Sequence, residues 1–319
     1  MPPITVPLKY AFIMNPQSGN RRSIKQWDTF KPAIDKHVGE HTMLHTERPG
    51  HATTLTRDAL NDGHTRIVSV GGDGTHYEVV NGFFENHTPI NPEASMAILP
   101  IGTACDLRKT LRLPEPDESI EYLTDPNPVA MDLGKVISTD SDGNEVTHYF
   151  LTAVHIGLGG LVGVHVNRRT KLFGGFITFL LGVITARLEY RCPEITATFD
   201  DQTVTGTMLE VIAANGQYDG GGMTVAPRCQ LNNGQLELYT VARMNFPDTL
   251  RNLPRIYKGT QDQHPDVGYY RTPEVTVSTT ATTPIWVSPD GEISGQLPAT
   301  ITTLPNALNM VMGPNPPLV

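Results

Sequence analysis

The chain has 319 residues, an apolar fraction of 39% that is ordinary for a soluble globular protein, and a formal net charge of −9. This length allows two domains with separate cores. The acidic balance argues against a general nucleic-acid binder, because such proteins usually carry a basic excess. The N-terminus lacks the long apolar core of a signal peptide. Three cysteines without a CxxC pair indicate a reducing compartment, so we expect a cytoplasmic protein.

The first 125 or so residues alternate between strand patterns and helix patterns. The predicted strands cover residues 10–15, 41–46, 65–72 and 95–102, and the predicted helices cover residues 23–38, 51–63, 76–86 and 105–111. Strict alternation of this kind is typical of a parallel sheet with helices on its faces. Ligands of such sheets bind beyond the C-terminal ends of the strands. We therefore expect the loops NPQSGN, GGDGT and PIGTACD to share one edge of the sheet.

Beyond about residue 126 the patterns become strand-like and rich in Thr and Val, with Gly, Asn and Asp in the turns. The predicted strands cover residues 129–137, 146–157, 194–201, 203–216, 222–227, 234–242, 269–280 and 283–294. This succession predicts an antiparallel sandwich or barrel. Helical patterns interrupt it at residues 161–188 and 247–259.

The stretch VGGDGTHYEVVNG, from Val70 to Gly82, places a glycine-rich loop between a strand and a helix. Thr75 and Glu78 fit a capping box at the start of that helix. Neither capping nor turning explains Asp73, because a carboxylate at a phosphate-binding helix N-terminus repels the phosphate. Asp73 becomes useful if it serves a Mg²⁺ ion or accepts a proton from an attacking hydroxyl, while backbone amides hold the phosphates.

Two other loops repeat this logic. In LPIGTACDL, Thr103 and Asp106 fit a helix cap, and Gly102 allows a close approach to a ligand. NPQSGN consists of common turn formers. The basic residues that follow it either form a solvated helix face or neutralise a triphosphate; they are Arg21, Arg22 and Lys25.

The motifs, taken in order, resemble those of the catalytic domain shared by diacylglycerol kinases, bacterial lipid kinases, sphingosine kinases and ceramide kinases. GGDGTHYEVVNG is close to the family signature GGDGTxNEVVNG, and LPIGTACDLRKTL resembles PxGTxNDFARxL. NGQYDGGGMTVAPRCQLNNGQLEL, from Asn215, resembles NGxxxGGGxxxAPxAxxxDGxLDV. Shorter resemblances are NPQSG at 15–19, TERPGHA at 46–52 and DGE at 290–292. Together these blocks cover nearly the whole chain.

The resemblance implies an α/β plus all-β fold with two domains. Residues 1–128 would form a Rossmann-like parallel-sheet nucleotide-binding domain, and residues 129–302 an antiparallel β-sandwich that binds lipid. The last segment, about residues 303–319, would return to the first domain. The family places its active site in the cleft that separates such domains. The P-loop pattern GxxxxGK[ST] is absent from the sequence, so the glycine loops would hold the phosphates with backbone amides.

The family also implies a reaction, in which the γ-phosphoryl group of ATP passes to a lipid hydroxyl with the help of Mg²⁺. By resemblance, the nucleotide-binding residues would be Asn15, Ser18, Thr46, Gly71, Gly72, Gly74, Thr75, Gly102 and Thr103. Asp73, Asp290 and Glu292 would be catalytic, with Asp73 and Glu292 on the metal. The general base is either Asp73 or Asp290, and we favour Asp290. Taken alone, SPDGEI also fits a hairpin turn.

Several positions depart from the family pattern. Cys105 stands where the family usually has Asn, and Asn233 where it usually has Asp. The block HIGLGG begins with His155, whereas the corresponding block of the family more commonly begins with small, polar residues. Sphingosine kinases carry acidic residues just downstream that hold the substrate amine, whereas this chain has Gly163 and His165. The resemblance therefore favours a neutral diacylglycerol-like or ceramide-like acceptor over a cationic sphingoid base.

The longest apolar stretch, Leu172 to Ala186, has 15 residues and is too short to span a bilayer comfortably. Basic residues flank it, namely Arg168, Arg169, Lys171 and Arg187. This segment either lies in a membrane interface or packs on the sandwich, and in both arrangements it could wall a lipid pocket. We expect ATP and a lipid at a membrane surface as partners, no nucleic acid, and a peripheral membrane location.

Two alternative functions stay open at this stage. One is a relative that phosphorylates a soluble acceptor, of the NAD kinase type, and the other is a nucleotide-binding protein without catalysis. Cys105 and Asn233 keep the second alternative open, whereas the acidic residues Asp73, Asp290 and Glu292 argue against it. The sequence also leaves the oligomeric state open, a homodimer included.

Overall fold

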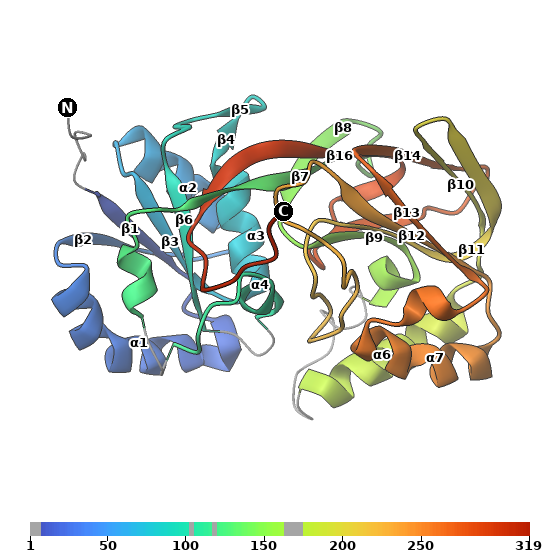
Figure 1. Cartoon of the computed structure of the whole chain (residues 1–319), viewed down its shortest axis with the longest axis horizontal. Helices are drawn as coiled ribbons and strands as arrows, with labels where there is room; N and C mark the ends of the chain where they lie inside the picture. The colour runs from blue at the N-terminus through green and yellow to red at the C-terminus, as the bar shows by residue number, and fades with distance from the viewer. Residues whose placement is uncertain (1–7, 102–104, 117–119, 163–174) are drawn as a thin grey trace. The chain divides into compact units, whose positions relative to one another are not determined.

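The computed structural model describes residues 8–101, 105–116, 120–162 and 175–319. The chain divides into two compact units, drawn in Figure 1. Unit 1 comprises Met1–Met131 and Ala307–Pro316, and unit 2 comprises Asp132–Asn306 and Pro317–Val319. Several sequence-predicted functional positions lie outside the described residues, namely Gly102, Thr103, Gly163, His165, Arg168, Arg169 and Lys171.

Unit 1 is built on a set of parallel strands in the order β2-β1-β3-β6. These strands are β1 (Tyr10–Met14), β2 (His41–His45), β3 (Arg66–Gly71) and β6 (Ser95–Pro100). The end of β16 (Gly295–Met310) lies beside β6, where Asn309 and Met310 pair in parallel with Ser95 and Met96. The parallel pairs agree with the sheet that the sequence predicts for this part of the chain.

Helices cover both faces of these strands, with α1 on one side and α2 and α3 on the other (Figure 1). The helices of unit 1 are α1 (Ser18–His37), α2 (His51–Asn61), α3 (Asp73–Gly82), α4 (Asp106–Thr110) and the 3₁₀ turn η1 (Glu121–Thr124). A small separate hairpin joins β4 (Phe84–Glu85) and β5 (Thr88–Pro89).

Strand β3 illustrates how both faces of the parallel sheet are buried. Successive side chains of a strand point to opposite faces of the sheet. Val68 and Val70 pack in one cluster with Trp27 and Ile34 of α1. Ser69, which lies between the two valines, instead hydrogen-bonds Nδ1 of a histidine in α3 over 2.7 Å. Coverage of both faces leaves the strand ends as the part of the sheet where a ligand can reach the backbone.

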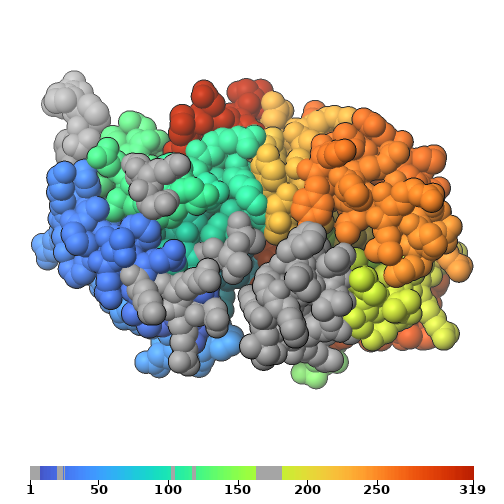
Figure 2. Space-filling view, turned by 90° about the horizontal axis from the view of Figure 1, so that it is seen from below, coloured from blue at the N-terminus to red at the C-terminus, as the bar shows by residue number. Residues whose placement is uncertain are grey.

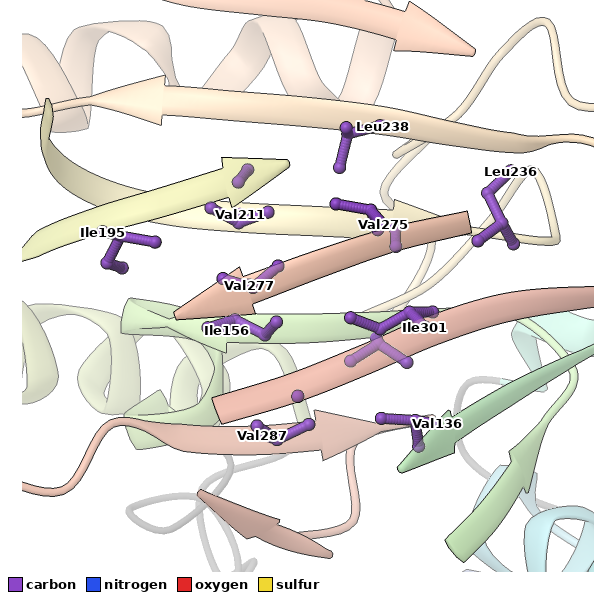
Figure 3. Packing of buried hydrophobic residues seen from close by; sticks show 14 of the residues in the cluster. Val136, Ile156, Ile195, Val211, Leu236, Leu238, Val275, Val277, Val287 and Ile301 are labelled. Carbon is purple, nitrogen blue, oxygen red and sulfur yellow. The ribbon is translucent and has the colours of Figure 1, made fainter. Parts of the chain in front are cut away.

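Unit 2 consists mainly of antiparallel strands. They are β7 (Val129–Thr139), β8 (Glu145–Phe150), β9 (Ala153–Gly157), β10 (Glu194–Phe199), β11 (Gln202–Ala214), β12 (Leu236–Ala242), β13 (Val267–Thr272), β14 (Glu274–Thr279), β15 (Trp286–Pro289) and most of β16. Figure 3 shows their inward-facing aliphatic side chains, which include Ile156, Val211 and Val287 and form a single apolar cluster. Unit 2 is therefore a β-sandwich-like domain, as the sequence predicts.

Helices α6 (Gly175–Glu189) and α7 (Phe246–Lys258) lie side by side on the surface of unit 2 (Figures 1 and 2). Arg187 joins them, because its Nε donates to Oγ1 of Thr249 over 3.3 Å and its guanidinium also bonds the carbonyl oxygen of Met244. A short 3₁₀ turn, η2 (Gln261–Gln263), follows α7. Among the described residues, no helix combines the length and apolar character needed to cross a membrane.

Two predicted strands are interrupted in the structure. The predicted strand 146–157 breaks into β8 and β9 at Leu151 and Thr152, whose backbone amides bond a carboxylate instead of a neighbouring strand. The predicted strand 269–280 breaks at Pro273, which has no N–H to donate to a ladder.

The predicted strand 222–227 is wrong. Gly220, Gly221 and Gly222 have φ angles of 65°, 86° and 98°, in the left-handed region that glycine adopts without strain. Around them, strand-like pairing is limited to an isolated bridge that joins Asp219 and Met223. These glycines, of which Gly222 was predicted to begin the strand, therefore form a turn.

Candidate active site

The ends of the parallel strands bring the predicted loops of unit 1 to one edge. The N–H of Thr46 donates to the carbonyl oxygen of Met14 over 2.8 Å, and the N–H of Asn15 donates to that of Val70 over 3.1 Å. On the other side of β3, the N–H of Ile101 donates to the carbonyl oxygen of Gly71 over 2.8 Å. The shared edge that the strand pattern predicts is thus present in unit 1.

Thr75 lies at the centre of this edge. Its Oγ1 is 3.2 Å from Nδ2 of Asn15 and 3.4 Å from Oγ of Ser18. A Cβ added to Gly71 would lie 2.5 Å from the same Oγ1 and 3.0 Å from Oγ of Ser18. Position 71 therefore has room only for glycine, and three of the sequence-predicted nucleotide-binding residues, Asn15, Ser18 and Gly71, lie around a fourth, Thr75.

The N-terminus of α3 lies directly beside these side chains. Gly72 is the N-cap residue in an extended conformation, and α3 begins at Asp73. The N–H groups of Thr75 and His76 already bond the carbonyl oxygen of Gly72, over 2.8 and 3.1 Å. A helix N-terminus favours anions through its dipole and its unpaired N–H groups. The edge can therefore bind a phosphate group.

The predicted capping box of Thr75 and Glu78 is wrong. The helix begins at Asp73, so Thr75 lies inside the first turn and makes no cap. Glu78 instead accepts hydrogen bonds from the N–H groups of Gly50 over 2.9 Å and Ala52 over 3.1 Å. These amides belong to the start of α2, so Glu78 fixes the TERPGHA segment against α3.

Asp73 has a contact that the sequence analysis did not predict. Its Oδ2 accepts from the N–H of Asp106 over 3.2 Å, and its Oδ1 from the N–H of Leu107 over 3.3 Å. These amides begin α4, so Asp73 holds the start of that helix. The carboxylate of Asp106 contacts Nζ of Lys109 over 3.0 Å. Thr103, the other residue of the predicted cap, lies outside the described residues.

Cys105, one of the departures from the family pattern, is the N-cap residue of α4 and has φ 48° and ψ 56°. This left-handed conformation is uncommon for residues other than glycine, and asparagine adopts it more readily than most. The geometry gives a physical reason for the asparagine that the family usually carries there. A cysteine at this position keeps the helix start but bears the conformational strain.

In unit 2, Asp290 follows β15 and also has a left-handed φ of 48°. Its Oδ2 accepts from the N–H of Leu151 over 2.7 Å. Its Oδ1 accepts from Thr152 twice, from the N–H over 2.8 Å and from the hydroxyl over 2.6 Å, and from the N–H of Ala153 over 3.3 Å. The interruption between β8 and β9 therefore forms a binding cradle for this carboxylate.

The surroundings of Asp290 shift its proton affinity. Burial raises the pKa of Asp290 to about 6, against the opposing effect of the hydrogen bonds from Thr152 and Leu151. The negative charge of Asp219 also raises this pKa. A carboxylate with a pKa near 6 is ionised at neutral pH and can still accept a proton in a reaction.

Glu292 lies two residues further on, in the turn that leads into β16. Its N–H donates to the carbonyl oxygen of Pro289 over 2.9 Å, and Gly291 has a φ of 81°. Strand β15 pairs with β16 on the far side of this turn, where Val287 lies opposite Gly295. The hairpin interpretation of SPDGEI is therefore confirmed, and Glu292 is half-buried near its tip.

A second polar cluster of unit 2 was missed by sequence reasoning. Nδ1 of His155 lies 2.7 Å from Oε1 of Glu210, and Nε2 lies 2.8 Å from Oδ2 of Asp219. Burial alone would lower the pKa of His155, but its hydrogen bonds to the two carboxylates outweigh burial and raise the pKa to about 10. The signal in the sequence was the unusual HIGLGG motif, which does not reveal the two acidic partners.

Asn233, the other departure, lies in the turn before β12. Its Oδ1 accepts from the N–H of Gln235 over 2.9 Å, as an aspartate could. The neighbouring Gly234 donates its N–H to Oδ2 of Asp132 over 2.6 Å. Within the described ranges, no group of three or more His, Cys, Asp or Glu side chains is arranged to hold a metal ion.

Known proteins resemble this chain over nearly its full length. Residues 9–136 match the family model of the diacylglycerol kinase catalytic domain, and residues 152–312 match that of the YegS C-terminal NAD kinase beta sandwich-like domain. A diacylglycerol kinase of Staphylococcus carnosus is 25% identical over 293 residues, which cover 92% of this chain and 91% of that protein. One of Staphylococcus aureus is 23% identical over 304 residues, which cover 95% and 91%.

Solved structures support the fold. A Bacillus anthracis protein matches with a TM-score of 0.74 at 22% identity, and a diacylglycerol kinase of the same species matches with a TM-score of 0.68 at 20% identity. Each match covers 96% of this chain and 97% of the other. The two family models account for both units, and the chain therefore belongs to the lipid kinase family that joins a diacylglycerol kinase catalytic domain to a YegS-type β-sandwich-like domain.

Proposed function

We propose that this protein transfers the γ-phosphoryl group of ATP to a hydroxyl of a diacylglycerol-like or ceramide-like lipid, with Mg²⁺ bound. The observation that carries the proposal is the strand edge of unit 1, where Thr75, Asn15, Ser18 and Gly71 meet at the start of α3. The parallel order β2-β1-β3-β6 supports a Rossmann-like description of this unit. Family membership supports kinase chemistry at that edge.

The nucleotide would use backbone donors more than charged side chains. Gly72 and Gly74 flank the first residue of α3, where N–H groups and the helix dipole favour phosphate oxygens. Thr46 would contact the nucleotide from the neighbouring strand end, held there through the anchoring of its segment by Glu78. Gly102 and Thr103 complete the proposed set on the strength of the sequence resemblance.

Asp73 and Glu292 are the residues that would hold Mg²⁺. Carboxylate oxygens are the protein ligands that this ion prefers, and it commonly uses one or two of them together with substrate phosphates. A dedicated protein cluster is therefore not required, and the position of Asp73 at the N-terminus of α3 fits the expectation. When bound, the ion neutralises charge on the phosphates.

Asp290 is the group that we assign to the acceptor hydroxyl. Its Oδ1 accepts three hydrogen bonds from the cradle and its Oδ2 accepts one, so Oδ2 is the oxygen with room for a hydroxyl proton. The cradle fixes the side chain, and a pKa near 6 keeps it ionised at neutral pH. Asp290 would therefore orient the hydroxyl and take its proton as the phosphoryl group is transferred.

A transfer assay tests this function. The protein is incubated with Mg²⁺ and ATP labelled at the γ-phosphate, with diacylglycerol, ceramide or sphingosine in mixed micelles, or with NAD as a soluble acceptor. We expect label in a neutral lipid. In Asp73→Asn, the rate at which label is transferred to that lipid should fall about 100-fold. Asp201→Asn, which changes an exposed carboxylate outside the site, should retain the activity.

Two other outcomes would contradict the proposal. Transfer to NAD in place of lipid would identify a soluble-acceptor kinase. ATP binding without transfer to any acceptor would identify a non-catalytic relative. Sedimentation with lipid vesicles tests the further proposal that the protein meets its substrate at a membrane surface, since a peripheral protein sediments with the vesicles and a purely soluble one stays in the supernatant.

A further inference from the structure

Two polar side chains, His155 and Ser288, lie on the face of β9 and β15 that points away from the apolar cluster of Figure 3. Strand β9 pairs with β15 and β11 so that His155 lies opposite Ser288 on one side and opposite Ile212 on the other. Directly opposite residues of an antiparallel pair point to the same face, with Cβ atoms about 5 Å apart. The neighbours Ile156 and Val287 belong to the core, so His155 and Ser288 share the outer face.

The carboxylates on this face make it rich in hydrogen-bond acceptors. His155 binds one oxygen of Glu210 and one of Asp219, and the three side chains keep 12%, 16% and 13% of their surface exposed. One imidazolium thus faces two carboxylates. Asp290 adds a third nearby, since its cradle includes Ala153, two residues before His155.

Two hydroxyl groups beside the cluster are buried and have no hydrogen-bond partner among the described residues. One is Oγ of Ser288, a residue with 1% exposure, and the other is Oη of Tyr190. Oη of Tyr190 lies 2.8 Å from the position that a Cβ on Gly157 would occupy, at the end of β9. Buried polar groups are nearly always paired, so these two hydroxyls are available to a polar ligand group at this face.

We propose that His155, Asp219, Glu210 and Ser288 form a subsite for a second hydroxyl of the lipid acceptor, next to the hydroxyl that is phosphorylated. The inference rests on the proposed kinase function. A hydroxyl can donate to a carboxylate and accept from Ser288 or Tyr190 at once, whereas an ammonium group can only donate. The preferred head group is therefore a neutral diol, as in a monoacylglycerol or a ceramide, and His155 is a positioning residue that orients both carboxylates.

The test compares two acceptors that differ in one hydroxyl, 1-oleoylglycerol and 3-hydroxypropyl oleate, with labelled ATP and Mg²⁺ in mixed micelles. Because a hydrogen bond to a charged group is among the stronger ones, we expect kcat/KM to be about tenfold higher for 1-oleoylglycerol. In Asp219→Asn and in Ser288→Ala this preference should fall towards one, through a higher KM for 1-oleoylglycerol. The KM for ATP and the rate with 3-hydroxypropyl oleate should stay as in the wild type.

Glu237→Gln is the matched control. Glu237 is a buried carboxylate of the same unit whose Oε1 accepts from Arg271 and Tyr269, so the variant has a comparable structural cost away from the cluster. It should keep the diol preference. Thermal unfolding of each variant shows whether it is folded, and Ser288→Ala, a small change, remains informative if Asp219→Asn does not fold.

Three results would overturn the inference. A wild type that uses both lipids equally would show that no second hydroxyl is recognised. An equal fall of kcat/KM for both lipids in Asp219→Asn and Ser288→Ala would show that the cluster has only a structural role. Both of these results leave the kinase function standing, whereas transfer to neither lipid, with transfer to a soluble acceptor, would overturn the proposed function and the subsite together.

Discussion

The hydroxyl of Thr152 donates a hydrogen bond of 2.6 Å to Oδ1 of Asp290, although the two residues are 138 positions apart in the chain. The same threonine donates its N–H to the same oxygen over 2.8 Å. This pair links the interruption between β8 and β9 to the turn after β15. The cradle fixes both the position of the proposed base and its affinity for a proton.

Replacement of Thr152 by valine should therefore change the pH dependence of the reaction. A hydrogen bond donated to a carboxylate stabilises the charged form, so its loss raises the pKa of Asp290 further. The acidic limb of the kcat profile should move to higher pH in Thr152→Val. Thr196→Val, which removes a hydroxyl from an exposed threonine pair, serves as the control. An unchanged pH profile of kcat in Thr152→Val would show that the Thr152 hydroxyl does not affect the pKa of the base.

The pH dependence of the transfer rate of the wild type gives a second prediction. Asp290 must be ionised to take a proton, and burial raises its pKa to about 6. The transfer rate should thus be nearly constant above neutral pH and fall as the pH drops below about 6. Initial rates from pH 5 to 8 at saturating ATP and lipid measure this. A rate that is flat across that range would show that no group with this pKa limits the reaction.

The paired histidine predicts a pH-dependent stability. Burial opposes the charge on His155, but its bonds with Asp219 and Glu210 raise the pKa to about 10 in the folded protein. An unfolded histidine has a pKa of about 6.5. Because the folded state binds the proton more tightly, this stabilisation is complete below about pH 6.5 and is lost as the pH rises through about 10.

Thermal unfolding from pH 6 to 10 measures that effect. The Tm of the wild type should fall over this range by more than the Tm of His155→Gln. The pKa of His148 is instead lowered by burial, so His148→Gln should keep the alkaline dependence of the wild type. If the wild type and His155→Gln lose stability in parallel, the imidazole is not held as a cation.

Gly71→Ala tests the proposed binding of phosphate at the strand edge of unit 1. The added Cβ would lie 2.5 Å from Oγ1 and 2.7 Å from Cβ of Thr75, so that side chain must move. We expect the free energy of unfolding to fall by about 1–3 kcal/mol and the Kd for ATP to rise. Gly206→Ala is the matched control, because a Cβ there has no atom within 4 Å. Unchanged ATP binding in Gly71→Ala would contradict a role for this edge in nucleotide binding.

The shared strand edge could be predicted from the sequence because it depends on local patterns. Asn15 and Gly71 each follow a short apolar run, and parallel strands bring their ends together whatever their neighbours are. The motif DGE likewise predicted the turn at Asp290, since Asp-Gly is a local turn signal. These features need no information about distant residues.

The contacts that tune the site depend on distant residues and escaped prediction. His155 meets partners 55 and 64 positions away, which no spacing rule connects. The role of Glu78 was missed because Gly72, and not Thr75, is the N-cap residue of α3, and Glu78 instead bonds the start of α2. Asp73 bonds the start of α4 because two strand ends meet in three dimensions, which motif spacing does not show.

The measurement that tests the account most directly is the transfer rate of Asp290→Asn at saturating ATP, together with its Kd for ATP. Asparagine keeps the size of the side chain but cannot take a proton. We predict that the rate falls about 100-fold or more while the Kd for ATP stays as in the wild type. A folded Asp290→Asn variant that transfers phosphate to lipid at the wild-type rate would contradict the assignment of Asp290 to the acceptor hydroxyl.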